Sequence, residues 1–130
     1  MPNSFYVINE ITVTREPEGA NGLYLLPVRL ILYLEFSKQF NLVIVHTSFG
    51  QYYTPGTIKF WTRALNASGH VFRIFDRVNS ANVRNIKRID TEKMYAYFDG
   101  GSKKCTLTTN DYEELEKEFP DITTLDYNTF

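Results

Sequence analysis

The chain has 130 residues, 43% of them hydrophobic, with ten Phe and nine Tyr, which suits the core of one globular domain and is too little for two. Its net charge is -1, yet residues 1–108 carry 13 Lys or Arg against 8 Asp or Glu, whereas residues 109–130 carry 1 against 7. The most apolar stretch is interrupted by Pro27 and Arg29, and the N-terminus lacks a basic start, so we expect neither a membrane span nor a signal peptide. The single cysteine excludes an internal disulfide, and a cytoplasmic location is the default expectation.

The first half of the chain has the composition of antiparallel strands. Residues 6–15 and 23–36 are rich in Val, Ile, Leu, Tyr and Thr, and the turn-like segment 17–22 lies between them, which predicts strands separated by a loop. Residues 42–47 and 51–54 are also β-prone, and the short connection between them contains a glycine. This spacing predicts a hairpin.

A short amphipathic helix is expected next. Thr57 can cap its N-terminus, because a Thr hydroxyl accepts a hydrogen bond from a free backbone N–H group of the first turn. Ile58, Trp61 and Leu65 then recur at helical spacing, so they form one apolar stripe that faces the core. Gly69 ends the pattern.

A basic stretch follows this helix. Residues 70–75 alternate as in a strand, the polar segment 78–82 has the composition of a loop, and residues 83–89 have that of a second strand. Such a charge run is either an ordinary solvated surface or a set of phosphate contacts. The basic residues in it are Arg73, Arg77, Arg84, Lys87 and Arg88.

The last part of the chain is predicted to be a hairpin followed by a helix. Residues 93–99 and 103–108 flank Asp-Gly-Gly, a strong hairpin signal, because glycine accepts the positive φ of such turns. Asn110 is then predicted to cap a helix, with Glu113 at its third position reaching back. We expect one domain over residues 1–119 and an acidic tail over residues 120–130.

The residues that could carry catalysis are in unfavourable positions. Cys105 shares strand parity with Leu107, as a buried small hydrophobic residue does, and His46 and His70 lie at the ends of apolar strands. No closely spaced Cys, His or Asp partners support a metal site, and no glycine-rich phosphate loop opens a helix. We therefore expect no enzyme activity and no cofactor.

The order of these features resembles the LytTR DNA-binding domain of bacterial transcription regulators over roughly residues 10–119. The matching features are a strand ending in Glu35, a strand pair, a helix after a Gly-Thr turn, a Phe-Arg strand, an Asn-x-x-x-Ile element from Asn82 to Ile86, and a glycine hairpin before the last helix. The resemblance implies a mostly β fold of small antiparallel sheets in an elongated arrangement, with two short α-helices. It also implies an output domain of the kind found in response regulators.

Three loops contact specific bases in this family, and the resemblance assigns them residue by residue. The first loop is 37–41, with Lys38 and Gln39 as candidates; the second follows the Phe-Arg strand and contains Arg77 and Asn79; the third is 108–110, with Asn110 as the candidate. Arg and Lys suit guanine edges or phosphate, while Gln and Asn suit adenine. Phosphate contacts are expected from Arg73, Arg84, Lys87 and Arg88.

Two departures from the family pattern keep a second hypothesis open. The second loop, DRVNSAN, is about one residue longer than usual and begins with an acid, and Thr109-Asn110 stands where Ser-Arg is common. The first hypothesis is sequence-specific binding of double-stranded DNA through loops in the major groove, as a dimer or as paired monomers on repeated sites. The second is a protein-interaction or regulatory module that keeps the fold without binding DNA.

Overall fold

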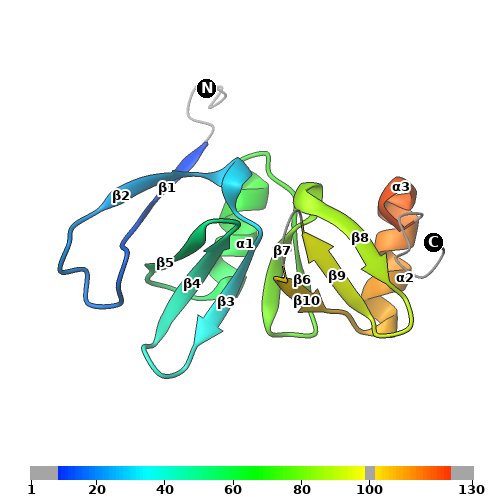
Figure 1. Cartoon of the computed structure of the whole chain (residues 1–130). Helices are drawn as coiled ribbons and strands as arrows, with labels where there is room; N and C mark the ends of the chain where they lie inside the picture. The colour runs from blue at the N-terminus through cyan, green and yellow to red at the C-terminus, as the bar shows by residue number, and fades with distance from the viewer. Residues whose placement is uncertain (1–8, 99–101, 124–130) are drawn as a thin grey trace, which may run out of the picture.

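A computed structural model describes residues 9–98 and 102–123, which form three antiparallel sheets and three α-helices (Figure 1). The strands are β1 (Glu10–Val13), β2 (Tyr24–Pro27), β3 (Tyr33–Ser37), β4 (Leu42–Thr47), β5 (Gly50–Thr54), β6 (Phe72–Phe75), β7 (Asn79–Asn82), β8 (Ile86–Asp90), β9 (Tyr95–Phe98) and β10 (Lys104–Thr106). The helices are α1 (Ile58–Ala67), α2 (Thr109–Glu118) and α3 (Pro120–Thr123), and two short 3-10 helices are η2 (Val28–Leu30) and η3 (Val83–Asn85). No helix within these described residues is long and apolar enough to cross a membrane.

The central sheet has the order β5-β4-β3-β7-β6 and carries a hydrophobic core on each face. Leu34 and Val45 pack on one face with the β1-β2 pair and with Leu65 of α1. Tyr33 and Ala81 pack on the other face with the β10-β9-β8 sheet and with α2. Neighbouring strand residues point to opposite faces, so Tyr33 and Leu34 of β3 enter different cores, and these consecutive residues are both apolar and buried.

The expected long strand over 23–36 is divided in the structure. Pro27 ends β2, which pairs with β1, and η2 then turns the chain so that β3 can pair with β4 and β7. Proline has no N–H group to give to a sheet, so a strand running through its position would lose a ladder hydrogen bond. The chain instead changes sheet there.

The expected loop over 78–82 is also wrong, because residues 79–82 form β7, buried between β3 and β6. Its polar side chains are used inside the fold: the Asn82 side-chain amide donates to the backbone oxygen of Ile31 at 3.0 Å. The Asn85 amide donates to the same oxygen at 2.7 Å and to that of Arg29 at 2.9 Å. The expected strand over 83–89 correspondingly begins as η3 and continues as β8.

The predicted β4-β5 hairpin and the first helix are confirmed. β4 and β5 pair in antiparallel register, and the Thr57 hydroxyl accepts from Phe60 N–H at 3.0 Å. Of the apolar stripe of α1, Leu65 is fully buried, while Trp61 is half-buried and donates its indole N–H to Pro55 O at 2.8 Å. β9 and β10 pair as predicted, although the turn 99–101 lies outside the described residues.

The predicted cap of the last long helix is wrong by two residues. Thr108, not Asn110, caps α2, and Asp111, not Glu113, completes the capping box. Thr108 has the extended backbone of the preceding chain, so the helix begins two residues earlier than the sequence pattern indicates. The segment expected to begin the tail forms α3, and its Ile122 packs against the core beside α2.

Candidate nucleic-acid interface

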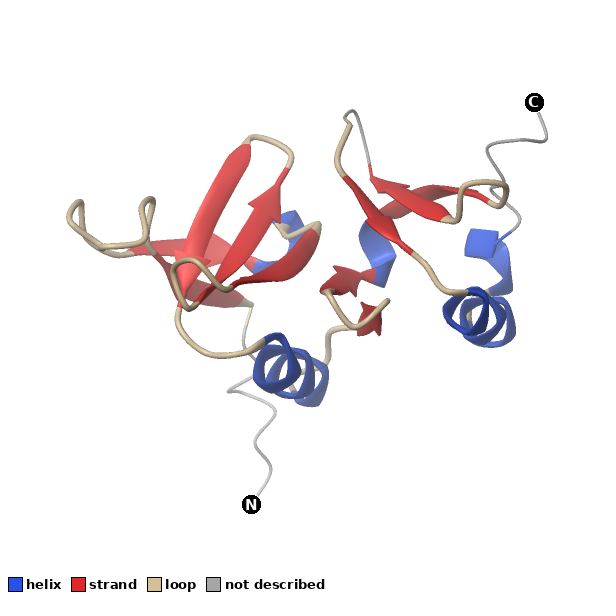
Figure 2. Cartoon of the chain, turned by 90° about the horizontal axis from the view of Figure 1, so that it is seen from below, coloured by secondary structure: helices blue, strands red, loops and turns tan. Residues whose placement is uncertain are grey.

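Strand register brings three connecting segments to one end of the five-stranded sheet. β3 runs antiparallel to both β4 and β7, and Glu35 is opposite Asn79. The C-terminal end of β3 and the N-terminal end of β7 therefore lie at the same end of the sheet. Figure 1 shows both turns along the lower edge of the molecule, and Figure 2 looks at this edge from below. We call it the turn end: the β3-β4 turn (38–41), the β6-β7 turn (76–78) and the first residues of α2.

The β3-β4 turn presents two of the predicted residues. Lys38 and Gln39 are exposed at its tip. The Ser37 hydroxyl accepts from Phe40 N–H at 3.2 Å, and Asn41 has φ of 55°, a conformation that asparagine tolerates better than most residues. The turn is therefore closed by its own polar groups, and the Lys38 and Gln39 side chains project outward.

The β6-β7 turn presents Arg77 in an unusual backbone conformation. Asp76 and Arg77 have φ of 51° and 61°, and Val78 N–H donates to Phe75 O at 3.1 Å to close the turn. Positive φ at both central positions is the pattern of a type I′ turn, which favours Asn-Gly and is uncommon for Asp-Arg. Arg77 is exposed there, as the sequence analysis requires of a base contact.

The start of α2 is joined to the β6-β7 turn by a carboxylate. Asp111 Oδ2 accepts from Asp76 N–H at 2.9 Å and from Thr108 N–H at 2.9 Å. Asn110 precedes Asp111 and is exposed. Asp111 therefore joins the second and third predicted loops, which sequence spacing alone did not show.

A fourth segment at this edge was missed by the sequence analysis. The β8-β9 turn contains exposed Lys93, and Leu107 N–H donates to Met94 O at 2.8 Å, which places this turn next to the start of α2. The available signal was Asp90, whose carboxylate accepts from the backbone N–H groups of Glu92 and Lys93, each at 3.0 Å. An Asp followed by polar residues is typical of such a turn.

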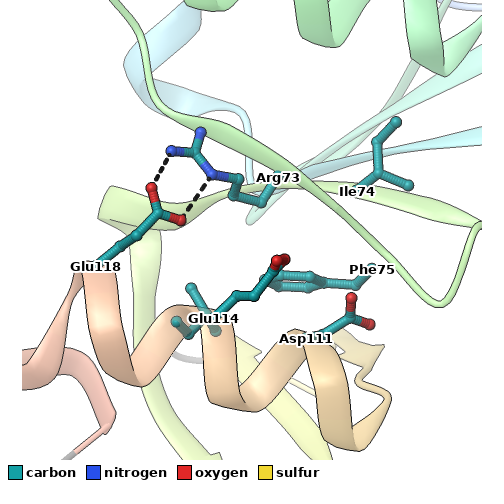
Figure 3. A pocket seen from close by; sticks show the side chains of 7 residues that line it. Arg73, Ile74, Phe75, Asp111, Glu114 and Glu118 are labelled. Atoms are coloured by element: carbon teal, nitrogen blue, oxygen red, sulfur yellow. Dashed lines mark hydrogen bonds and ion pairs between the residues drawn. The ribbon is translucent and has the colours of Figure 1, made fainter.

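Two of the predicted contact residues are engaged by other parts of the fold. Arg73 makes a two-pronged ion pair with Glu118 of α2, with Nη2 to Oε2 at 2.8 Å and Nε to Oε1 at 3.3 Å, and this guanidinium lowers the pKa of Glu118 (Figure 3). Arg73 also lies over the Phe119 ring at 5.8 Å. Asn79 is only 9% exposed within β7, because the segment expected as a loop is a strand. Neither side chain is presented at the turn end.

The remaining basic residues lie along a different part of the molecule. Arg84 is exposed in η3, which follows β7 and is therefore at the opposite end of the sheet from Arg77. Lys87 is exposed at an irregularity in the β8-β9 pairing, and Arg88 lies over the Tyr97 ring at 5.0 Å. The basic stretch of the sequence thus divides between two regions.

Three polar side chains centred on buried His46 link the five-stranded and three-stranded sheets. His46 Nε2 donates to Glu35 Oε1 at 2.8 Å, and Lys103 Nζ donates to His46 Nδ1 at 3.2 Å. Burial lowers the pKa of His46; the Glu35 hydrogen bond opposes this and the Lys103 charge adds to it. Because Nδ1 accepts from an ammonium, the contact with Glu35 is a hydrogen bond from a neutral imidazole rather than an ion pair.

Among the described residues, these groups form no metal centre. Cys105 is fully buried, and burial raises the pKa of its thiol, so it lacks the thiolate character of a nucleophile. Residues 9–98 and 102–123 contain no group of three or more His, Cys, Asp or Glu placed to hold a metal ion.

Comparison with known proteins agrees with this geometry. The family model of the LytTr DNA-binding domain matches residues 21–119. The fold is similar to a solved structure, the LytTr DNA-binding domain of a putative methyl-accepting/DNA response regulator from Bacillus cereus, with 16% identity, a TM-score of 0.66, and coverage of 85% of this chain and 95% of that chain. A search of curated proteins gives no match. With three polar segments gathered at one end of its central sheet and a family match over most of its length, the chain belongs to the LytTR DNA-binding domain family.

Proposed function

We propose that this chain is the DNA-binding part of a cytoplasmic transcription regulator and recognises a specific sequence of double-stranded DNA with its turn end in the major groove. The observation that carries the proposal is the convergence of Lys38, Gln39, Arg77 and Asn110 at one end of the five-stranded sheet. These side-chain types form paired hydrogen bonds with base edges: Arg and Lys with guanine, Gln and Asn with adenine.

Phosphate contacts are proposed for the exposed cations beside the turn end and along β8. Lys93 lies next to the start of α2, and Lys87 lies on β8, which leads to the turn that contains Lys93. Such contacts attract and orient DNA without distinguishing its sequence. Arg84 is at the far end of the sheet, so it reaches phosphate only if DNA extends past β7.

Binding to repeated sites by two copies would supply the affinity that a small, nearly neutral domain lacks.

The decisive experiment is selection of bound duplexes from genomic fragments at low salt, followed by titration of the best duplex and of a random duplex. We expect a preferred sequence and a higher affinity for it than for the random duplex. Failure to recover any preferred duplex at low salt would refute the DNA proposal and favour the interaction-module hypothesis.

Arg77→Ala tests which part of the surface recognises sequence. We expect a loss of about 1 to 3 kcal/mol on the best duplex and much less on random duplex, because a base contact contributes only where the base is present. Arg63→Ala is the matched control, since Arg63 is an exposed arginine of α1, on the other layer of the fold. If both variants weaken both duplexes equally, Arg77 does not read bases.

The alternative is a protein-interaction module without DNA binding. Its support is the acidic exposed side of α2, with Glu113, Glu114 and Glu116, and the engagement of Arg73 by Glu118. A basic partner protein would fit this charge. A mobility-shift titration with duplex DNA at low and moderate salt separates the two functions. A DNA-binding domain gives a complex that weakens as salt rises, whereas an interaction module without DNA binding gives no complex.

A further inference from the structure

We infer that Asp111 is a positioning residue for sequence recognition: its carboxylate fixes the β6-β7 turn against α2 and thereby the direction of Arg77, although Asp111 itself contacts no base. This inference rests on the proposed function. It extends that function by naming a specificity determinant outside the side chains that the resemblance assigned.

The hydrogen bonds of Asp111 join segments that are far apart in the sequence. One oxygen, Oδ2, accepts from Thr108 N–H in the capping box and from Asp76 N–H across the gap between the segments, both at 2.9 Å. Asp111 N–H returns a hydrogen bond to the Thr108 hydroxyl at 3.0 Å. Figure 3 shows Asp111 on the side of α2 that faces Phe75 at the end of β6. The carboxylate therefore holds both its own helix start and the neighbouring turn.

The β6-β7 turn needs such an external contact. Its two central residues, Asp76 and Arg77, are not glycine yet both have positive φ, a conformation that L residues adopt at a cost. The turn is closed by a backbone hydrogen bond from Val78 N–H to Phe75 O, beside the Phe75–Asn79 strand pair. The Asp76 N–H group belongs to the Phe75–Asp76 peptide, which leads into the residue before Arg77. A bond to it restrains how the chain enters the turn and, through Asp76, the direction of Arg77.

Asp111 is itself held on a fixed element. Leu115 of α2 is buried in the same core cluster as Phe75, and the Arg73–Glu118 ion pair attaches the far end of α2 to β6 (Figure 3). A carboxylate at the start of a helix is favoured by the helix dipole, and hydrogen bonds to a charged acceptor are stronger than neutral ones. α2 is thus a rigid support, and Asp111 transmits its position to the turn.

The test compares Asp111→Ala with Asp111→Asn. The Asn side chain keeps an oxygen that accepts both N–H groups, whereas Ala removes it. We measure the ratio of affinities for the selected duplex and random duplex. D111A should lower this ratio roughly tenfold or more, as loss of one base contact does, while D111N should keep it within about threefold of the parent.

Two controls separate positioning from charge and from stability. Glu116→Gln removes one negative charge from the exposed side of α2, and it should strengthen binding to both duplexes equally, leaving the ratio unchanged. In the double variant R77A/D111A, the ratio should equal that of R77A alone, because a residue that acts only through Arg77 adds nothing once Arg77 is gone. A folded D111A with the parental ratio overturns the inference, and so does additivity in the double variant.

A measurement without DNA distinguishes failure of this inference from failure of the proposed function. The amide of Asp76 should exchange with solvent roughly tenfold faster in D111A than in the parent or D111N, as expected when a hydrogen bond is lost. If the parent shows no sequence preference, the proposed function fails, and unchanged Asp76 exchange in D111A then also overturns the positioning role.

If D111A does not fold, Asp111→Glu replaces it, since Glu can complete a capping box while its longer chain moves the carboxylate away from Asp76. D111E with parental ratio and parental exchange counts against the inference.

Discussion

At the turn end of the five-stranded sheet the chain is exposed, and two consecutive non-glycine residues, Asp76 and Arg77, have positive φ. At the opposite end, the amides of buried Asn82 and half-buried Asn85 donate to backbone oxygens in and directly after η2. One end holds polar side chains outward on restrained turns. The other end uses the same residue types inward, where each satisfies backbone carbonyls. The difference shows that the role of a polar residue in this chain can be inferred only when its position in the sheet is known.

The largest expected effect on stability comes from removing a buried amide at the end of the sheet opposite the turn end. Asn82→Ala should cost about 1 to 3 kcal/mol in free energy of unfolding, because the buried Asn82 amide donates to the backbone oxygens of Ile31 and Val28. Ile31 O keeps the Asn85 amide as a second donor, whereas Val28 O loses this side-chain donor. Urea unfolding measures this. Asn110→Ala, at the turn end, is exposed and should change stability by less than about 0.5 kcal/mol. Equal costs for both variants would remove the proposed difference between the two ends.

The second effect concerns charge outside the turn end. If Lys87 contacts phosphate, Lys87→Ala should weaken all duplexes alike and reduce the slope of log K against log salt by about 1. Arg84→Ala gives the comparison at the far end of the sheet, and an unchanged slope there would confine the DNA to the turn end and β8. A change of sequence preference in either variant argues against a phosphate contact.

A third test uses pH to examine buried His46 and its hydrogen-bond partners Glu35 and Lys103. Burial lowers the pKa of His46 from 6.5, so the folded state binds fewer protons than the unfolded state; stability is full above about pH 6.5 and declines as pH falls through the lower folded value. One proton limits the decline to about 1.4 kcal/mol per pH unit. Tyr33 and Cys105 also face this site, but burial raises both of their pKa values, so they stay neutral in this range.

His46→Gln is the control for this titration. Gln can keep a donor toward Glu35 and an acceptor toward Lys103 without titrating. The difference in unfolding free energy between the parent and H46Q should therefore change below pH 6.5 and stay constant above it. A difference that is flat from pH 5 to 8 contradicts the assignment of a neutral, buried His46.

The smallest expected effect is at the β6-β7 turn. Asp76→Gly relieves the positive φ at one central position and keeps the backbone N–H that donates to Asp111, so it should stabilise the fold by about 0.5 kcal/mol. Thermal unfolding measures this change. A loss of stability instead would mean that the Asp76 side chain contributes to the turn in a way that the backbone does not explain.

The sequence predicted the hairpins and α1 because their signals are local. Glycine-containing turns, alternating strands and the Thr57 cap each depend on residues within a few positions, and the structure confirms them. The mostly β class and the family follow from the order of such signals. Lys38, Gln39, Arg77 and Asn110 were predicted to contact bases from loops or from the start of the last helix; all four are exposed, and their base contacts stay a prediction.

The parts that were missed depend on contacts distant in sequence. β7 contains Asn79, Ser80 and Asn82, so hydrophobic periodicity does not detect it; its burial is compensated by partners such as Thr62 of α1 for Ser80 and Ile31 for Asn82. For α2, both Thr108 with Asp111 and Asn110 with Glu113 fit a capping pattern. The structure has the first pair, in which Asp111 also reaches the turn 35 residues away.

The position of Cys105 gives the molecule a single chemical reporter. It is the one cysteine of the chain and lies fully buried in β10, in the core shared by the three-stranded sheet, α2 and the face of β3 that carries Tyr33. A thiol reagent reaches it only when these layers separate, so its rate of labelling measures that opening rather than fraying of the surface turns. A duplex bound across the segments of the turn end would hold these layers together and slow the labelling of Cys105. The thiol reagent itself leaves the exposed surface unmodified.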